Sequence, residues 1–441
     1  MCTHHVPSLV LSRDGDKQVS GGRNLFVICL EPDFAKVRDT LCCMKDSDKK
    51  VLVVTTVPIT LTSFLLPLTR ALRAQGWQVD ALSAGASAWP GLEGEFDALF
   101  DVEWSRKLSS FRHYPRIAHR LRRLVAARGY DVVHVHTPIA SFMTRFALRK
   151  TTGLRMIHTA HGFHFYRAQD ASEARRGRLF RRAEQLCLHW TDDLIVMNDE
   201  DEISARELLA SIAGVDGRTR ATLHRIDGIG IELSDWTPQP LSADREAQLR
   251  QEYQLPPEAF TVVTIAELND NKRHNMLLDA IALLTATSPH LRFLFVGTGP
   301  LDQQLHNRVD AENLPVSFTG QISHELLREL LKLCNLGLLV SEREGLPRSL
   351  MEICAAGVPI AGTRTRGIID EVLDERALAH EATAEAVADL VESLSIDKEL
   401  RAELARTQLE YASAHFTLET IIPQYLALYE AAGATPLALQ R

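Results

Sequence analysis

The sequence has no apolar run long enough to cross a membrane, because none reaches the ~18 consecutive apolar residues that a spanning helix needs. Its N-terminus also has no basic segment followed by an apolar core, so it does not resemble a secretory signal. These two absences exclude an integral membrane protein and argue against export. We therefore expect the protein in the cytoplasm.

Paired cysteines and acidic metal motifs are also scarce. The seven cysteines are odd in number and show no zinc-type spacing, so we expect reduced thiols. The Asp-x-Asp runs at Asp14–Asp16 and Asp46–Asp48 precede the first strong strand and cannot line a cleft between domains. We expect no metal and no cofactor, and we expect no nucleic-acid partner.

The chain has 441 residues, which exceeds what one hydrophobic core usually serves, so two domains are expected. Apolar content of 45% and charged content of 24% are ordinary for a soluble enzyme and exclude a fibrous or wholly disordered chain. Acidic residues concentrate in the second half, whereas the first half is basic. A basic half suggests an anionic partner, although a solvated basic face fits equally well.

Short apolar runs alternate with amphipathic stretches from Val51 onward, which is the pattern of parallel sheets covered by helices. We expect two tandem α/β domains of the doubly wound type, with ligands bound where the carboxyl ends of both sheets face each other. RIDGIGIE (225–232) is a plausible hinge. The expected divisions are an N-terminal extension, 1–47, which is left outside the fold and within which Met44 is a possible start; a first domain, 48–228; a second domain, 229–415; and a C-terminal helix and tail, 416–441.

The segment SEREGLPRSLMEICAAGVPI carries the most informative chemistry. After an apolar strand, Glu344 opens a loop that Gly345 and Pro347 shape, and the pattern predicts a helix from about Arg348 that carries Glu352. The N–H groups at such a helix start bind anions such as a diphosphate. Two carboxylates with seven residues between them can accept hydrogen bonds from different hydroxyl groups of one ligand. An ordinary loop-to-helix junction is the alternative.

This segment resembles the E-x7-E signature of glycosyltransferase family 4, which comprises retaining transferases with the GT-B fold. The resemblance implies two Rossmann-like doubly wound domains that face each other across a cleft. It also implies that Glu344 contacts the donor sugar, that Glu352 contacts the ribose, and that the turn from Gly345 through Leu346 to Pro347 binds the donor.

VVTIAELNDNKRHNMLLDAI places Lys272 at the start of a helix, where a lysine can act as a point charge on a leaving diphosphate. In the resembled family a basic residue at the strand end shares this role, but this sequence has Glu267 there. The glycine turns VGTGP and GQIS follow the next two strands, and the resemblance places Gly297, Gly299 and Ile322 around the nucleotide.

Histidines mark the same edge of the first domain. His161 lies just beyond an expected strand, and the family histidine at this position lies near the donor sugar and the reaction centre. His136 ends the preceding strand. A structural histidine is the competing interpretation for both, and it is the stronger one for His136.

The segments TTVPITLTSFLLPL, VVHVHTPIASFMTR and HTAHGFHFY resemble the family members that build bacterial exopolysaccharide and lipid-linked oligosaccharides, which implies a polyprenyl-diphosphate-linked acceptor. Eight basic residues and no acid lie between Arg106 and Arg128. An apolar stripe of Ile117, Leu121, Leu124 and Val125 accompanies them. Such a helix can lie on an anionic bilayer, or the stripe can pack on its own sheet.

The sequence therefore predicts a metal-independent retaining glycosyltransferase of the hexosyl or N-acetylhexosaminyl type, which uses a UDP- or GDP-linked sugar and a lipid-linked glycan acceptor. We expect it in the cytoplasm or peripherally on the inner face of the plasma membrane. A nucleotide-sugar 2-epimerase and a non-catalytic sugar-nucleotide-binding subunit of a polysaccharide assembly complex remain the alternatives.

Overall fold

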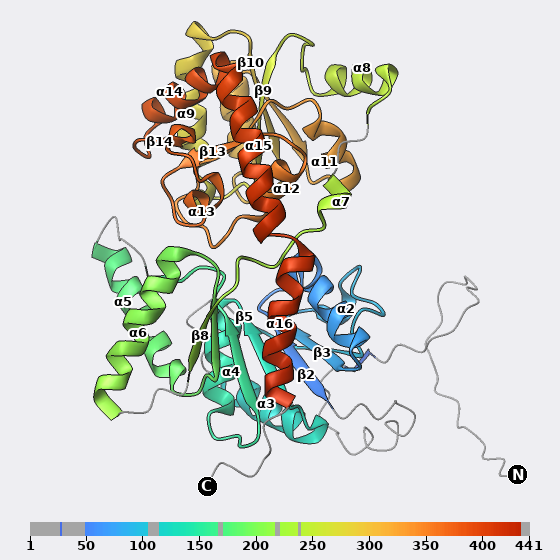
Figure 1. Ribbon diagram of the computed structural model, residues 1–441, viewed down its shortest axis with the longest axis vertical. Coiled ribbons are helices and arrows are strands. Elements are labelled where there is room, and N and C mark those ends of the chain that lie inside the picture. Colours follow the sequence, from blue (N-terminus) through green and yellow to red (C-terminus); the bar gives the residue numbers. More distant parts are fainter. Residues whose placement is uncertain are drawn as a thin grey trace, which may run out of the picture.

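The protein is described from a computed structural model that covers residues 27–28, 49–104, 114–165, 171–216, 221–236 and 240–433. Figure 1 shows two α/β lobes stacked one above the other. Each lobe contains a parallel sheet with helices on both faces, which confirms the expected pair of doubly wound domains.

The first domain contains a sheet of eight strands, and every pairing in it is parallel. The strands are β1 (Val27–Ile28), β2 (Lys50–Val54), β3 (Gln78–Ser83), β4 (Ala98–Asp101), β5 (Val132–His136), β6 (Arg155–Thr159), β7 (Asp193–Val196) and β8 (Thr222–Arg225). Their order across the sheet is β1-β4-β3-β2-β5-β6-β7-β8. The main helices are α2 (Leu66–Ala74), which follows a π-helical turn (Leu61–Leu65), α3 (Tyr114–Arg128), α4 (Pro138–Leu148), α5 (Ala171–Leu188) and α6 (Asp199–Asp216).

Strand β2 illustrates why these segments are continuous apolar runs. Its alternate residues Val51 and Val53 pack into the core on one face of the sheet, while Leu52 and Val54 pack into the core on the other. A strand covered by helices on both faces has no polar side. At the far edge, β1 pairs with β4, so Val27–Ile28 joins the sheet although the sequence analysis leaves residues 1–47 outside the fold.

The second domain contains a parallel sheet of six strands in the order β11-β10-β9-β12-β13-β14. The strands are β9 (Phe260–Ile265), β10 (Leu291–Val296), β11 (Val316–Gly320), β12 (Leu336–Leu339), β13 (Ile360–Thr363) and β14 (Leu378–Ala379). Its helices are α7 (Leu233–Trp236), α8 (Ala243–Glu252), α9 (His274–Thr287), α10 (Asp302–Glu312), α11 (His324–Leu331), α12 (Arg348–Ala355), α13 (Ile368–Val372), α14 (Ala384–Ile396) and α15 (Lys398–His415). The last helix of the chain, α16 (Leu418–Gly433), follows α15.

The chain crosses between the domains twice, and the two crossings run side by side. Ile231 donates its N–H to the Phe416 carbonyl at 2.8 Å and accepts the N–H of Leu418 at 3.0 Å. Beyond this point α16 lies against the first domain, where Tyr429 is fully buried in the same core as Val51. Figure 1 shows α16 extending down from α15 along that lobe. The C-terminal helix is therefore part of the first domain's core.

Helix α3 carries the predicted apolar stripe on the side that packs against the sheet. Leu121, Leu124 and Val125 are buried against the first domain's own sheet, and only Ile117 is partly exposed. The stripe is therefore not available to insert into a bilayer, and only the polar side of α3 faces solvent. The part of the predicted basic segment between residues 105 and 113 lies outside the described residues.

Cysteine placement agrees with the expectation of reduced thiols where it can be seen. Cys187, Cys334 and Cys354 are buried and free, and burial raises the pKa of each thiol. Cys2, Cys29, Cys42 and Cys43 lie outside the described residues.

In the described part of the chain, every helix is too short or too polar to span a bilayer.

Candidate active site

The carboxyl ends of the two sheets meet at a cavity of about 330 Å³. Its first-domain wall includes Thr60, Thr137 and His161, and its second-domain wall includes Lys272 and the start of α12. In doubly wound folds ligands bind at this edge of the sheet, because the loops that leave parallel strands converge there. A second cavity of about 210 Å³ adjoins it and shares His161, Glu344 and Gly345.

Glu344 lies at the centre of this site and is paired with Lys272. The Lys272 Nζ is 2.5 Å from the Glu344 Oε1, and both side chains are largely buried. Lys272 is the last residue of a short 3₁₀ turn (Asp270–Lys272) and lies two residues before α9, whereas the prediction placed it in the first turn of a helix. The Asn269 side chain caps the turn by accepting the Lys272 N–H.

Asn271 fastens this turn to the loop that carries Glu344. Its carbonyl accepts the Glu342 N–H at 2.7 Å, and its side-chain amide donates to the Arg343 carbonyl at 3.0 Å. The Arg343 guanidinium donates back to Asn271 Oδ1 at 3.2 Å. Three hydrogen bonds thus fix the turn that carries Lys272 against the loop that carries Glu344.

Helix α12 begins at Arg348, as predicted, and no side chain caps its N-terminus. Arg348 and Ser349 at this helix start line the larger cavity, so their N–H groups are a candidate anion site. Glu352 is buried and accepts a hydrogen bond from the Arg348 Nε at 2.7 Å. Arg348 also donates to the Ser63 carbonyl of the first domain, so this arginine links Glu352 to the opposite wall.

His161 lies on the first-domain wall of the cavity, across from Glu344, and it contacts His136. The His161 Nε2 lies 3.0 Å from the His136 Nδ1, and the Nε2 of His136 is buried with no hydrogen-bond partner among the described residues. Behind them, His134 bonds the Tyr429 hydroxyl of α16 at 2.6 Å and the Thr159 hydroxyl at 2.7 Å. His136 is therefore buried, as a structural histidine would be, and it also contacts His161 directly.

Burial keeps these imidazoles neutral near pH 7. It lowers the pKa of His134 to about 3 and that of His161 to about 4, and it lowers the pKa of His136 well below its usual value. Neighbouring histidines act in the same direction. A neutral His161 can donate one hydrogen bond and accept another, which suits contact with sugar hydroxyls.

The two walls touch backbone to backbone at Gly162 and Gly345. A Cβ on Gly345 would lie 2.5 Å from the His161 carbonyl oxygen, and one on Gly162 would lie 3.2 Å from the Gly345 Cα. Gly162 also has a φ of 102°, a conformation that side chains rarely allow. The Asn198 side chain donates to the Gly345 carbonyl at 2.7 Å across the same seam. Only glycine permits this approach, which brings His161 beside Glu344.

Asp201 belongs to an Asp-x-Asp run, Asp199–Asp201, that the sequence analysis passed over. It is buried, pairs with Arg366 at 2.6 Å and accepts the Phe163 N–H. This carboxylate therefore joins the two domains. Among the described residues, no group of three or more His, Cys, Asp or Glu side chains is placed to hold a metal ion.

Of the other residues predicted to contact the donor, some line the cavities and some do not. Leu346 and Pro347 line the larger cavity beside Glu344. Gly297, Gly299 and Ile322 line neither of the two cavities. An added Cβ on either glycine would meet the backbone of Ala266 or Leu268, so these glycines pack closely against the segment between β9 and Lys272.

Several residues at the site were not predicted from the sequence. Thr137 lines the larger cavity in a strained conformation, with φ 62° and ψ 140°, and its hydroxyl contacts the Thr56 hydroxyl at 2.7 Å. Phe64 packs 6.2 Å from the His161 ring. Arg343 lines the smaller cavity, whereas Glu267, the departure from the family pattern, is exposed and accepts a bond from Asn269. A positive φ at a threonine gives no signal in a single sequence.

Comparisons with known proteins cover both domains. A family profile described as Glycosyltransferase Family 4 matches residues 62–210, and one described as Glycosyl transferases group 1 matches residues 245–410. The Bacillus subtilis protein EpsD, which is named as a glycosyltransferase, is 31% identical over 329 residues. The matched region covers 72% of this chain and 80% of EpsD.

Solved structures share the two-domain arrangement. Sucrose-phosphate synthase from Thermosynechococcus elongatus superposes with a TM-score of 0.70 at 20% identity, over 88% of this chain and 99% of its own. HepE from Anabaena, solved in complex with UDP and glucose, gives 0.68 at 17% identity, over 87% and 100%. These likenesses confirm the GT-B fold that the sequence predicted.

The buried histidines predict how stability depends on pH. Unfolding returns each pKa to about 6.5, so below that pH the unfolded chain binds protons that the folded chain does not. The free energy of unfolding should therefore fall as the pH is lowered from 7 to 5, by up to about 2 kcal/mol per fully buried histidine. Urea unfolding at each pH measures this dependence.

His136→Asn should reduce that pH dependence, because one of the buried imidazoles is gone. The exposed His290→Asn serves as the matched control and should keep the wild-type dependence. Equal pH dependence in all three proteins would contradict the assignment.

Proposed function

The chain belongs to the glycosyltransferase family that combines the Glycosyltransferase Family 4 and Glycosyl transferases group 1 regions, and from this premise we propose its reaction. We propose that it transfers a hexosyl or N-acetylhexosaminyl group from a UDP- or GDP-linked donor to a lipid-linked glycan, with retention of anomeric configuration, in polysaccharide biosynthesis. The single observation that carries the proposal is the Lys272–Glu344 pair, set between two domains opposite His161.

The donor fits the second-domain wall. Its diphosphate would lie at the uncapped start of α12 and draw Lys272 away from Glu344. Glu344 would then accept hydrogen bonds from the sugar hydroxyls, and Glu352 from the ribose. HepE was solved in complex with UDP, which supports a uridine nucleotide for a protein of this fold.

The proposed transfer step is a same-face attack, as the resemblance to the retaining family implies, and the charges at the site support it. The acceptor oxygen forms a bond to the anomeric carbon on the face from which the diphosphate departs, and the bond between that carbon and the phosphate oxygen breaks. The acceptor's hydroxyl proton passes to the departing diphosphate, whose charge Lys272 and the N–H groups of α12 stabilise. His161, neutral at pH 7, would orient a sugar hydroxyl. A glycosyl-enzyme trapped by mass spectrometry would contradict this mechanism.

The acceptor would bind the first domain, and we propose that the protein meets the cytoplasmic face of an anionic membrane through α3. The stripe of α3 is buried, so the contact would be electrostatic and would use exposed residues such as Arg120 and Arg123. Each basic residue near such a surface contributes about 1 kcal/mol. We expect pelleting with anionic vesicles, weakened by salt, and little pelleting with neutral vesicles. Equal pelleting with both vesicle types would contradict the contact.

A direct test is nucleoside-diphosphate release across a panel of UDP- and GDP-sugars, with and without bacterial membrane lipid extract. We expect one donor to give acceptor-dependent release. Glu344→Gln should lower kcat at least 100-fold, because it removes the carboxylate that holds the sugar in the transition state. Glu342→Gln is the matched control, since its side chain lies in the same loop but lines neither cavity.

The same assay separates the rival functions. Interconversion of the donor without acceptor would identify an epimerase. Binding of a nucleotide sugar with no turnover under any condition would identify a non-catalytic subunit.

A further inference from the structure

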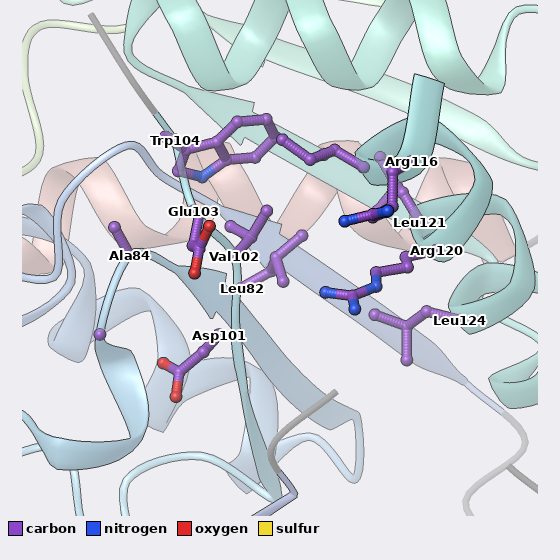
Figure 2. Close-up of a pocket in the computed structure, with 12 residues that line it drawn as sticks. Leu82, Ala84, Asp101, Val102, Glu103, Trp104, Arg116, Arg120, Leu121 and Leu124 are labelled. Carbon is purple, nitrogen blue, oxygen red and sulfur yellow. The ribbon is translucent and has the colours of Figure 1, made fainter. Parts of the chain in front are cut away.

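A third cavity, of about 620 Å³, lies in the first domain away from the donor site. It is enclosed by the ends of β3 and β4 and by the first half of α3. Figure 2 shows Arg116 and Arg120 extending from α3 on one side of the cavity and Glu103 on the opposite side, with Leu82 and Val102 between them. Its apolar lining is Leu82, Val102, Trp104, Ile117, Leu121 and Leu124.

The two arginines of this cavity differ from their neighbours on α3. Arg128 is buried and pairs with Asp80 at 2.7 Å, and Arg122 donates to the Ala147 carbonyl at 2.9 Å. Arg116 and Arg120 are exposed, stand four residues apart on one side of the helix, and make no ion pair or hydrogen bond to any described residue. Two guanidinium groups on one side of a helix can together donate charge-assisted hydrogen bonds to a phosphate-bearing ligand.

Two carboxylates, Asp101 and Glu103, also line the cavity and balance the formal charge of the two arginines, but among the described residues neither forms an ion pair with them. Asp101 is engaged by Ser87, which donates its backbone N–H at 3.0 Å and its hydroxyl. Glu103 is exposed at the rim. Since the remaining lining is apolar, the cavity suits an amphipathic ligand with an anionic group at one end.

The cavity and the donor site lie at the same edge of the first domain's sheet. The Thr55 hydroxyl, after β2, donates to the Ser83 hydroxyl at the end of β3 at 2.9 Å, and the neighbouring Thr56 bonds Thr137, which lines the donor cavity. Strands β5, β2, β3 and β4 are adjacent in that order. With strands about 4.8 Å apart, the two sites lie roughly 10 to 15 Å apart, on the scale of a short saccharide.

We propose that this cavity binds the phosphate-bearing end of the lipid-linked acceptor. Arg116 and Arg120 pair with its phosphate oxygens, and the apolar lining receives the first carbons of the lipid. The sugar attached to that phosphate then extends along the strand ends toward His161. The inference rests on the proposed function, because only a lipid-linked acceptor places a phosphate and a lipid beside its sugar.

The test uses farnesyl diphosphate as the probe, with the full-length protein saturated with UDP or GDP so that the donor site is occupied. Calorimetry compares this probe with farnesol and with inorganic pyrophosphate. Arg116→Gln/Arg120→Gln should weaken farnesyl diphosphate binding at least tenfold, because two charge-assisted hydrogen bonds are lost. Arg122→Gln/Arg123→Gln makes the same change of charge on the same helix outside the cavity, and it should stay within twofold of wild type.

Three results would overturn the inference: no binding by the wild type, equal loss in both double variants, or equal affinity for pyrophosphate and farnesyl diphosphate. The second result would mean that α3 attracts anions through its overall charge. Circular dichroism and thermal unfolding establish that each variant is folded. The proposed ligand of this cavity and the proposed function can fail separately, because probe binding needs no turnover. Probe binding without sugar transfer in the donor panel would contradict the function. Sugar transfer without probe binding would contradict the proposed ligand of the cavity.

Discussion

The close contact between Gly162 and Gly345 is the constraint on which the site depends. Neither domain holds a complete site, because His161 lies on one and Glu344 on the other. Their loops meet without intervening side chains, and a Cβ on Gly345 would lie 2.5 Å from the His161 carbonyl oxygen. The Asn198 amide and the buried Arg366–Asp201 pair then fix the approach. The geometry of the proposed reaction centre is therefore a property of the interface between domains.

The charges at this interface are held in place by contacts between protein groups. Lys272 and Glu344 neutralise each other at 2.5 Å, and Asn271 holds the two loops in register. Pairing offsets part of the desolvation cost that each charge would carry alone in a partly buried cavity, and an incoming diphosphate can replace the carboxylate as the partner of the lysine. Glu267 bonds Asn269 and takes no part in this pair. Arg343, next to Glu344 in its loop, lines the adjoining cavity and adds a second positive charge.

Much of this account could be predicted from the sequence, and the failures have physical causes. Strands buried on both faces are continuous apolar runs and were found, but β4 (ALFD) and β8 (TLHR) are short or polar and gave no such signal. The motif that contains Glu344 identified the family, which comparison confirmed. Its pairing with Lys272, 72 residues away, could not be predicted because it depends on the folded loops. Which side of α3 faces the sheet was equally open, since an apolar stripe fits a membrane and a protein core alike.

Gly345→Ala tests the central claim most directly, with kcat/KM for sugar transfer and the solution radius of gyration measured on the same protein. The added methyl group must separate the two loops, and a displacement of about 1 Å at a reaction centre can cost 100-fold in rate. We expect kcat/KM to fall at least tenfold and the radius of gyration to rise, while Gly177→Ala, whose Cβ meets only an ordinary contact at 3.7 Å, leaves both unchanged. Full activity and an unchanged radius of gyration in Gly345→Ala would contradict the account.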